Sequence, residues 1–332
     1  MRLIDKYGRQ HDYLRISLTD KCNLNCSYCS PQKKYEKGDI TNVLSFEEML
    51  RLIKIFVVNL NFSKIRFTGG EPLVRKNIMY FFERLADFKK ETPFELCLTT
   101  NGILLNENVE KLKKYGLDKI NISIDSLNSE RYFQITGSRS LENVLRAVEE
   151  IEKFGYSPIK INAVVMKGIN DDEVFDFVNL VRERNIVVRF IEYMPFSSNN
   201  WQSDLFISKD ELLTRIRESY NIEIDPDCKP GVADEYKING FKGRIGFISS
   251  ISDHFCDDCN RLRITATGNL KLCLFSKSDS ELSLSYLLRN SFFSDEAIAA
   301  RIALHIQNKE KAHPSLEEII SLKDNNMLSI GG

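Results

Sequence analysis

The sequence predicts an α/β fold: an incomplete (β/α)6 TIM-like barrel whose mouth is closed by a smaller C-terminal α+β region. Two observations lead to this prediction. Strand-like and helical segments alternate through the first two thirds of the chain, and polar and apolar residues alternate within the strands. A chain of 332 residues is long enough for one large domain and a smaller one.

Six strand-like segments recur in the first two thirds, and a helical pattern follows each of them. Strands that alternate with helices form parallel βα units, so we expect one parallel sheet. The segments are Leu14–Leu18, Ile65–Thr68, Phe94–Thr99, Ile120–Asp125, Ile159–Val165 and Val187–Glu192.

Local signals mark the start of two helices. In a capping box a serine precedes a glutamate by three residues, and the two side chains bond to each other's backbone N–H groups. Ser45 with Glu48 and Ser208 with Glu211 have this spacing. We therefore expect a helix to begin at each pair.

The pattern inside the strands indicates a polar interior. Parallel strands covered on both faces are nearly continuous apolar runs, whereas here Arg15, Arg66, Lys160 and Arg189 alternate with apolar residues. Burying these cations unpaired would cost several kcal/mol each. We therefore expect the sheet to curl around a polar, anionic ligand, with its site at the carboxyl ends of the strands.

The C-terminal region has a different pattern. It contains short strands at Gly240–Ser249 and Arg261–Ala266 and a helical stretch over Leu282–Gln307. We place the boundary after residue 215, which gives a partial barrel over residues 1–215 and a C-terminal region over residues 216–332. This region is expected to complete the closure of the barrel.

The composition favours a cytoplasmic protein with no membrane or nucleic-acid partner. The formal net charge is −1, the first residues lack the apolar run of a secretory signal, and no stretch reaches the length of a membrane span. Eight cysteines in such a chain are typical of a reducing compartment, where thiols bind metals or do redox chemistry.

Cys22, Cys26 and Cys29 lie close together in the run TDKCNLNCSYCSP, after the first predicted strand. Cubane iron–sulfur clusters usually take four protein thiolates, so three would leave one iron open for a small molecule. The alternatives are a zinc loop or a few buried thiols. Structural zinc takes four ligands, and no His or further Cys follows nearby, so we favour the cluster.

Cys256, Cys259 and Cys273 form a second trio, which begins with a C-x-x-C pair. Its spacing leaves zinc and iron–sulfur open about equally, because His254 or Cys228 could be a fourth zinc ligand. The context of these cysteines, more than their spacing, has to decide between the two.

The second predicted strand ends in Thr68-Gly69-Gly70-Glu71-Pro72. Two adjacent glycines let the backbone approach a ligand closely, and the proline stops further strand pairing. Taken alone, the motif is most simply a turn. Beside a strand that carries the cysteine loop, we interpret it as an amino-acid-binding rim.

Together these motifs resemble a known family. CNLNCSYC is similar to the C-x3-C-x2-C signature of radical S-adenosylmethionine enzymes, and GGEP to their methionine-binding strand end. Within that superfamily the chain resembles the GTP 3′,8-cyclases of molybdenum-cofactor biosynthesis, in order from about residue 10 to residue 332. The segments concerned are LRISLTDKC, IRFTGGEPL, LTTNG, INISIDSL, IKINAVVMKGIND, RFIEYM, FCDDCNRLRIT and the terminal GG.

The resemblance implies that the first trio holds a [4Fe–4S] cluster whose open iron chelates S-adenosyl-L-methionine, the source of a 5′-deoxyadenosyl radical. It also implies that Tyr28, Gly70, Ser123 and Met194 line the S-adenosylmethionine site. Simpler roles stay open: Tyr28 as an anchor of its loop, Ser123 as a satisfied strand hydroxyl and Met194 as core packing.

By the same resemblance, the second trio holds another [4Fe–4S] cluster, whose open iron faces the guanine of GTP. No P-loop is present, so the triphosphate must be bound by scattered side chains. Without the resemblance, Arg261 and Arg263, which lie between Cys259 and Cys273, would be interpreted as a solvated pair on a loop. The implied substrate-binding residues are Arg15, Arg66, Thr99, Lys160, Arg261 and Arg263, with Arg189 as a further candidate.

The implied reaction removes hydrogen from C3′ of GTP, joins C3′ to C8 and takes up an electron and a proton. Its implied partners are an external one-electron donor and the next pathway enzyme, which forms cyclic pyranopterin monophosphate; a homodimer is also expected. Gly331 and Gly332 are most simply a frayed end, but in the resembled family they reach into the active site and are needed for turnover.

Two positions depart from the family pattern. Cys97 stands where we expect a smaller residue, and we interpret it as a small buried thiol. Ser30 stands where Met is common. Neither departure changes the implied chemistry.

Other functions compete with this interpretation. A radical enzyme that modifies a peptide shares the first motif, but the Arg-x-Arg between the second cysteines argues against it. A zinc-binding interaction module would make both trios structural. A histidine-based hydrolase has little support, because none of the four histidines falls on a predicted strand end.

Overall fold

One large sheet organises the fold, and the computed structural model describes residues 1–29, 42–228, 231 and 233–331. The sheet has 12 strands, with a parallel centre and antiparallel margins. The parallel strands in spatial order are β12 (Arg261–Ile264), β3 (Tyr13–Ser17), β4 (Lys64–Thr68), β5 (Glu95–Thr100), β6 (Lys119–Ser123), β7 (Ile159–Val165), β8 (Ile186–Glu192) and β11 (Arg244–Ile248).

Short antiparallel strands extend both margins of the sheet. A separate two-stranded ribbon lies near the N-terminus. The added strands are β13 (Asn269–Lys271) and β14 (Leu282–Ser283) beyond β12, β10 (Asp234–Ile238) and β9 (Ile222–Ile224) beyond β11, and β1 (Leu3–Ile4) with β2 (Gln10–His11) in the ribbon.

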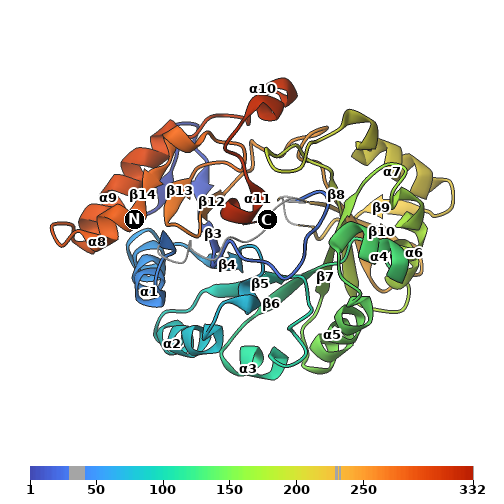
Figure 1. The fold of residues 1–332 in the computed structure, drawn as a ribbon, viewed down its shortest axis with the longest axis horizontal. Helices are drawn as coiled ribbons and strands as arrows, with labels where there is room; N and C mark the ends of the chain where they lie inside the picture. Colours follow the sequence, from blue (N-terminus) through green and yellow to red (C-terminus); the bar gives the residue numbers. More distant parts are fainter. Residues whose placement is uncertain (30–41, 229–230, 232, 332) are drawn as a thin grey trace.

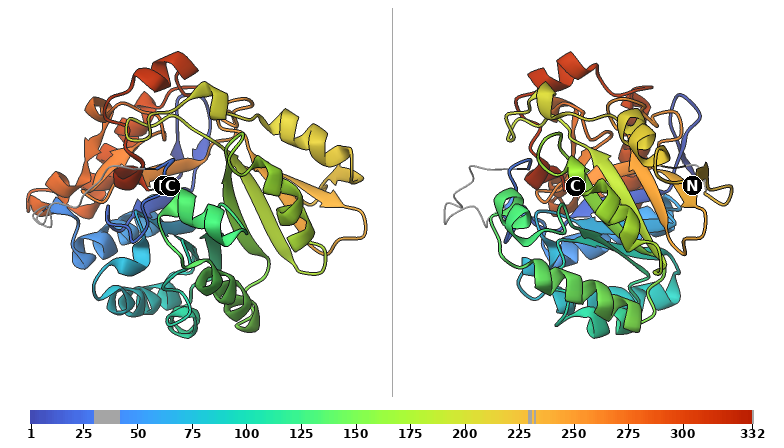
Figure 2. Two further views of the ribbon diagram at one scale, coloured as in Figure 1. Left: turned by 45° about the vertical axis from the view of Figure 1, so that its right-hand side comes forward. Right: turned by 90° about the vertical axis from the view of Figure 1, so that its right-hand side faces the viewer.

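Helices lie along the outside of the sheet, as Figure 1 shows for α1, α2, α3 and α5. Figures 1 and 2 both show the C-terminal helices α8 and α9 beside α1, where Arg51 pairs with Asp295 at 2.7 Å. The α-helices are α1 (Phe46–Lys54), α2 (Ile78–Glu91), α3 (Val109–Lys114), α4 (Ser129–Thr136), α5 (Leu141–Lys153), α6 (Val174–Leu180), α7 (Lys209–Arg217), α8 (Leu284–Arg289), α9 (Asp295–His305), α10 (Leu316–Ser321) and α11 (Met327–Ile330).

Short helical turns complete the described secondary structure. A π-helical turn continues α1, and the others are single 3-10 turns. They are η2 (Ile55–Asn59), η3 (Pro72–Val74), η4 (Asp171–Glu173), η5 (Ser203–Leu205), η6 (Ser278–Ser280) and η7 (Ile306–Asn308).

The six strands predicted from the sequence are all present, as β3 to β8, parallel and adjacent in chain order. Their observed bounds differ from the predicted ones by at most two residues: the segment predicted at Ile120–Asp125 is Lys119–Ser123, and Ile159–Val165 is reproduced. The mainly parallel α/β sheet is therefore confirmed.

The C-terminal strands join this same sheet, which the sequence did not predict. β11 pairs in parallel with β8, and β12 pairs in parallel with β3 at the opposite edge. The predicted strand Gly240–Ser249 was too long, because Gly240 lies in the preceding turn with φ of +80°. The sheet thus continues across the predicted boundary at residue 215.

One predicted capping box is complete and the other is half formed. Ser45 accepts a hydrogen bond from the Glu48 backbone at 3.1 Å, and Glu48 accepts one from the Ser45 backbone at 2.7 Å. Ser208 accepts from the Glu211 backbone at 3.2 Å, but the Glu211 carboxylate pairs with Lys167 and Arg215. Both serines nevertheless start their helices, α1 and α7.

The helical stretch predicted over Leu282–Gln307 is wrong in part. Its first residues form strand β14, and residues 290–294 separate α8 from α9. The separation has a local cause, since Ser294 caps α9 by accepting a hydrogen bond from Ala297 at 3.2 Å.

The two faces of the parallel sheet differ as the alternation predicted. Leu14, Ile16, Ile65, Phe67 and Ile122 are all buried in the main apolar core. The intervening side chains face the opposite side of the sheet. Within the described residues, no helix has both the length and the apolar character that crossing a bilayer requires.

Candidate active site

A cavity of about 550 Å3 lies on the polar face of the sheet. Alternate residues of β3, β4, β6, β7 and β8 line it, which agrees with the inward-facing polar pattern, whereas β5 contributes no lining residue. The C-terminal region supplies its remaining walls. The polar lining residues of these strands are Tyr13, Arg15, Lys64, Arg66, Lys119, Asn121, Lys160, Asn162 and Arg189.

This cavity lies toward the amino ends of the strands. Tyr13, Lys64 and Lys119 are the first residues of β3, β4 and β6, and Lys160 is the second residue of β7. The sequence placed the whole site at the carboxyl ends, which is incomplete. The polar lining extends to the amino ends because the side chains on this face of the sheet are polar along most of each lining strand.

The first cysteine trio lies at the carboxyl end, on the loop that follows β3. The backbone N–H of Cys29 donates to the Cys26 carbonyl at 3.0 Å, which folds the loop into a turn. Burial, then Asp125, Cys29 and Cys22, raise the pKa of the Cys26 thiol well above its usual value. Cys22 and Cys29 therefore lie close enough to Cys26 to oppose its ionisation, a penalty that a bound cation would relieve.

The GGEP motif packs directly against the backbone of this loop. Gly70 N–H donates to the Thr19 carbonyl at 2.7 Å, and Glu71 N–H donates to the Lys21 carbonyl at 2.8 Å. A Cβ on Gly70 would lie 2.3 Å from the Lys21 oxygen. Glycine is thus required here to seat the cysteine loop, a reason that the sequence interpretation did not give.

The Glu71 carboxylate links the two strands that end beside the cysteine loop. Its carboxylate accepts hydrogen bonds from Leu73 N at 3.0 Å, Thr100 Oγ1 at 2.8 Å and Asn101 N at 2.7 Å. Burial raises the pKa of Glu71 to about 7 despite these bonds. The carboxylate therefore ties the ends of β4 and β5 together beside the cysteine loop.

Tyr28 anchors the cysteine loop to the sheet. Its hydroxyl donates to Asp125 Oδ2 at 2.8 Å, and its carbonyl accepts from Asn199 at 2.8 Å. Burial raises the pKa of Asp125 to about 6. The simpler role considered for Tyr28, an anchor of its loop, is therefore present in the structure, and a ligand contact stays a prediction.

Ser123 and Met194 lie at the carboxyl ends of β6 and β8. Ser123 is the last residue of β6 and is half-buried beside Asn162 of β7. Met194 follows β8, lines the cavity and also packs against the apolar cluster that contains Phe196 and Phe275. The structure thus brings both residues to the side of the sheet that carries the first trio.

The second trio lies at the opposite, amino end. Cys256 and Cys259 precede β12, which runs parallel to β3, and Cys273 follows the antiparallel strand β13. All three line the cavity, as do His254 and Cys228. The His254 ring packs edge-on against His313, with 5.0 Å between ring centroids.

The thiols of the second trio differ in their surroundings. Burial, then Cys273 and Cys259, raise the pKa of Cys256. Burial would also raise the pKa of Cys259, but Lys309 and Arg261 outweigh it and lower the pKa. Cations therefore favour a thiolate at Cys259.

Several cations lie close together where β3, β4 and β12 line the cavity, a part that we call the cavity floor. Arg15, Arg66 and Arg263 are adjacent in register on β3, β4 and β12. Burial and Arg263 lower the pKa of Arg15 well below its usual value, and burial and Arg261 lower that of Arg263 to about 10. An anion bound among them would relieve this repulsion.

Arg66 is held in place by three acceptors. It donates to the Tyr13 hydroxyl at 2.7 Å, the Leu98 carbonyl at 3.0 Å and Thr99 Oγ1 at 3.2 Å. Thr99 is thus brought to the cation cluster through Arg66. Burial would raise the pKa of Tyr13, but Arg66, Arg15, Arg261 and Lys64 outweigh it and lower the pKa to about 8.

One carboxylate among these cations was missed from the sequence. Glu235 of β10 accepts hydrogen bonds from Lys160 Nζ at 3.2 Å and from the Arg189 guanidinium. Burial would raise the pKa of Glu235, but Arg189 and Lys160 lower it, so the carboxylate is charged. Burial and Arg189 in turn lower the pKa of Lys160 to about 8.

Two buried amides were also missed as site residues. Asn121 Oδ1 and Asn162 Oδ1 are buried without a hydrogen-bond partner in the described structure, and both residues line the cavity. A buried polar atom without a partner is costly, so a ligand that donates to these oxygens would be favoured. Their inward position was visible in the strand alternation.

The C-terminal tail runs between the two ends of the site. The Gly331 carbonyl accepts a hydrogen bond from Arg263 at 2.9 Å, and a Cβ on Gly331 would lie 2.4 Å from Thr68 Oγ1. Gly331 has φ of +78°, which also favours glycine. Figure 1 shows α11, just before it, near the centre of the molecule. Gly332 lies outside the described residues.

The remaining cysteine predictions have different outcomes. Cys97 is fully buried on β5, and its thiol donates to Glu95 at 3.3 Å, in agreement with a small buried thiol. The position of Ser30 lies outside the described residues. In the described part of the chain, no three His, Cys, Asp or Glu side chains are placed to hold one metal ion.

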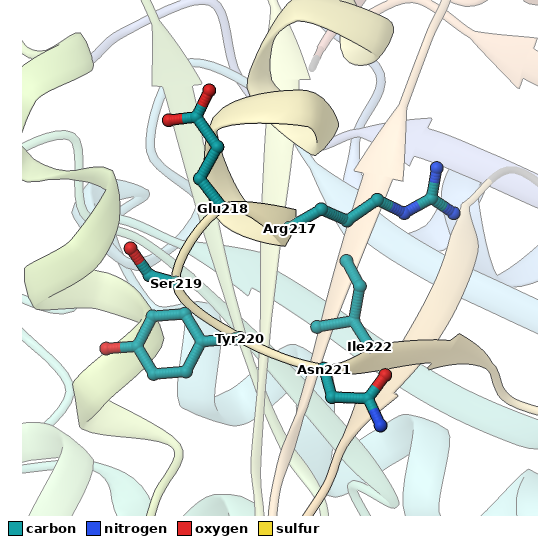
Figure 3. A pocket seen from close by; sticks show the side chains of 6 residues that line it. All are labelled: Arg217, Glu218, Ser219, Tyr220, Asn221 and Ile222. Atoms are coloured by element: carbon teal, nitrogen blue, oxygen red, sulfur yellow. The ribbon is translucent and has the colours of Figure 1, made fainter.

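A second depression lies on the surface, between the end of α7 and β9. It is lined by consecutive residues of one segment, Arg217–Ile222, whose side chains point in different directions (Figure 3). No residue predicted to belong to the site lines it. The candidate site is therefore the cavity together with the loops at its two ends.

Comparison with known proteins identifies the family. The sequence matches the Radical SAM superfamily over residues 16–181 and Molybdenum Cofactor Synthesis C over residues 186–315. A GTP 3′,8-cyclase of Peptoclostridium acidaminophilum is 43% identical over 332 residues, which cover 99% of this chain and 98% of that protein. The chain belongs to the GTP 3′,8-cyclase family.

Other relatives are longer than this member of the cyclase family. Molybdenum cofactor biosynthesis protein 1 of Dictyostelium discoideum is 40% identical over 333 residues, which cover 99% of this chain but 52% of the relative. The chain therefore spans about half the length of that relative. Membership of the radical SAM superfamily implies S-adenosylmethionine and a [4Fe–4S] cluster as cofactors.

A solved structure supports the fold. Streptococcus suis SuiB bound to S-adenosylmethionine matches with a TM-score of 0.59 and 14% identity, over 95% of this chain and 76% of that one. At this identity the likeness concerns the fold alone. It agrees with the parallel α/β sheet of this cyclase-family chain.

Proposed function

We propose that the chain is a GTP 3′,8-cyclase: it converts GTP to (8S)-3′,8-cyclo-7,8-dihydroguanosine 5′-triphosphate, the first step of molybdenum-cofactor biosynthesis. The observation that carries this proposal is a cation-lined cavity with one cysteine trio at each end. The full-length match to a GTP 3′,8-cyclase supports it.

Cys22, Cys26 and Cys29 fit the [4Fe–4S] cluster that the superfamily implies, because the three thiols belong to one short loop, Cys29 and Cys22 lie near enough to Cys26 to raise its pKa, and no fourth cysteine belongs to the described part of that loop. When bound, the cluster and S-adenosylmethionine supply the 5′-deoxyadenosyl radical that takes hydrogen from C3′ of GTP. Gly70 holds the cysteine loop against β4, and Tyr28 holds it through Asp125. Together with Ser123 and Met194, these two residues would line the S-adenosylmethionine site.

Cys256, Cys259 and Cys273 would hold a second [4Fe–4S] cluster at the amino end. Its support is local: all three thiols open on the cavity and cations surround them. Guanine would lie against this end, where Arg261 also stacks on Phe255 with 4.9 Å from its guanidinium carbon to the ring centroid. His254 and Cys228 line the same cavity and keep the zinc alternative testable.

The triphosphate would be bound by the cations of the cavity floor. Arginine forms paired, charge-assisted hydrogen bonds with phosphate, and lysine acts as a point charge. Thr99 would orient Arg66 as it does in the structure. The proposed contacts are Arg15, Arg66, Thr99, Lys160, Arg261 and Arg263, with Arg189 as a further candidate.

The architecture that we propose for this chemistry is an incomplete (β/α)6 barrel over residues 1–215, whose mouth is closed by a C-terminal region over residues 216–332. Supporting features are the six βα strands β3 to β8 and the tail seated against Thr68. Closure would keep water from a reactive radical. Gly331, with Gly332, would position the substrate within this closed space.

The proposed reaction sets the partners. Addition of C3′ to C8 leaves a radical that needs one electron and one proton, so an external one-electron donor is required. The next pathway enzyme would take the product and form cyclic pyranopterin monophosphate. We also propose a cytoplasmic location and a homodimer.

Anaerobic incubation of the reduced chain with S-adenosylmethionine and GTP tests the function. We expect 5′-deoxyadenosine, methionine and the cyclised nucleotide. Cys26→Ala should abolish all three products, whereas Cys97→Ala, which removes a buried thiol far from either trio in sequence, should retain them. Formation of 5′-deoxyadenosine without a cyclised nucleotide would mean that GTP is the wrong substrate.

A further inference from the structure

Lys309 is a buried lysine next to the second trio. It follows the helical turn η7, and its side chain is almost fully enclosed, with 4% of the residue exposed. Its ammonium donates hydrogen bonds to the Arg261 carbonyl at 3.1 Å and to the Leu272 carbonyl. Nothing in its sequence context, the charged run QNKEKAH, indicates burial.

The two acceptors join the segments that carry the trio. Arg261 lies two residues after Cys259, and Leu272 directly precedes Cys273. These segments belong to different strands, β12 and the end of β13. Lys309 therefore fixes the position of Cys259 relative to Cys273 from a third part of the chain.

The acceptors described for the Lys309 ammonium are two backbone carbonyls. No described carboxylate forms an ion pair with it, and its described interactions are the two carbonyl bonds and the fields that it exerts on its neighbours. Arg9 contacts the same region but pairs with Asp5 at 2.6 Å. A buried ammonium without an anion is strongly unfavourable, so an anion near it would be stabilised.

A cluster on three cysteines would be that anion. Three thiolates on a doubly positive iron–sulfur core leave a net negative charge, and reduction adds another. Net charge and hydrogen bonding around the sulfurs set the reduction potential of such clusters. A buried cation favours the more negative, reduced state.

We propose that Lys309 is a positioning residue for a second [4Fe–4S] cluster, which aligns Cys259 with Cys273 and supplies the buried positive charge that stabilises the reduced cluster. This inference rests on the proposed function, because it requires that the second trio binds a cluster. It assigns to Lys309 a task that the substrate-binding cations do not perform.

The test uses the full chain with the first trio replaced, Cys22→Ala, Cys26→Ala and Cys29→Ala, so that one cluster remains to be titrated by electron paramagnetic resonance. Adding Lys309→Met should lower the ratio of reduced to oxidised cluster at least tenfold at a given potential, equal to about 59 mV for one electron. Lys311→Met removes an exposed lysine two residues away and should leave the potential unchanged.

A second variant covers loss of folding. Lys309→Gln keeps one carbonyl hydrogen bond and removes the charge, so it should shift the potential in the same direction, and Lys309→Arg should restore it. If the reduction potential is unchanged in Lys309→Gln, the proposed role of Lys309 is wrong, and the second cluster is unaffected by that result. Absence of iron from the parent triple variant would instead overturn the second cluster, and the present proposal with it.

Discussion

Glu235 places a negative charge among residues that we propose to bind a triphosphate. Its carboxylate forms ion pairs with both Lys160 and Arg189. A carboxylate at this position competes with phosphate for the same donors. Its charge also offsets part of the repulsion between these two cations, through which Arg189 lowers the pKa of Lys160.

Replacing Glu235 by Gln should strengthen GTP binding. The amide keeps a hydrogen-bond acceptor but no longer neutralises the cations, so we expect the Kd for GTP to fall by about three- to tenfold, or ~1 kcal/mol. Isothermal titration calorimetry on the anaerobic protein measures this. Glu152→Gln, which breaks a peripheral pair with Arg184, is the matched control and should have no effect. Weaker GTP binding in Glu235→Gln would show that Glu235 instead orients the cations.

The Tyr13 hydroxyl should lose its proton at a pH about two units lower than a free tyrosine does. Its pKa is lowered from 10.0 to about 8 because surrounding cations outweigh burial. Between these values the unfolded chain keeps the proton and the folded chain has lost it, so this group adds stability as pH rises from about 8 to 10.

Phenolate absorbance during a pH titration measures this ionisation. A component with a midpoint near 8 should be present in the parent, absent from Tyr13→Phe and retained in Tyr7→Phe, which removes an exposed ring. If the low component survives in Tyr13→Phe, the cation cluster does not act on Tyr13.

Residues whose chemistry is local were predictable from the sequence, and residues whose surroundings come from distant segments were not. The cysteine trios are visible as spacing, and Arg15, Arg66 and Lys160 as a period of two. Glu235 lies on a strand whose pattern is that of an ordinary edge, and only its packing on β11 turns it toward Lys160. Lys309 was missed for the same reason.

At the scale of elements, the short helix α11 delivers Gly331 to a narrow place. Gly331 fits between Thr68, Gly69 and Ser17, where a Cβ would lie 2.4, 3.1 and 3.2 Å from their atoms. Gly240, in the turn before β11, has nearly the same φ, +80° against +78°, but nothing within 4 Å of a Cβ. The two glycines share a positive φ, but Gly331, with ψ of 116°, lies outside the left-handed helical region, and their surroundings also differ.

Gly331→Ala should therefore impair the reaction more than its effect on folding explains. Each alanine is expected to strain the backbone by about 1–3 kcal/mol. A displaced tail should in addition lower kcat by about 10- to 100-fold, because small errors in positioning are costly in catalysis. Turnover and thermal unfolding of both variants separate the two effects. Equal activity in Gly331→Ala and Gly240→Ala would exclude a role for the seated tail.

The strands were predicted best where pairing follows chain order. β3 to β8 are neighbours in sequence and in space, so periodicity and connection length sufficed. β11 and β12 pair with β8 and β3 across long separations, and no local pattern encodes such a partner. The break between α8 and α9 was missed because the capping serine, Ser294, lies within a run that was read as continuous helix.

At the scale of the whole molecule, the two trios occupy opposite ends of one sheet and share no loop. We therefore expect them to load independently. The parent should bind about eight iron per chain, and each triple Cys→Ala variant about four, whether the first or the second trio is removed. Iron and acid-labile sulfide analysis measures this. Loss of all iron from either triple variant would contradict independent loading, and zinc without sulfide would favour a structural metal.

The pairing of β3 with β12 has a consequence for biosynthesis. β3 ends at Ser17, but the strand that covers its outer edge begins at Arg261. At about 5–20 residues per second, a ribosome needs roughly 10–50 s to add the intervening residues. During that time the nascent chain presents an open strand edge, which is a template for mispairing. Protection by chaperones should therefore matter most for this protein while it is still being translated.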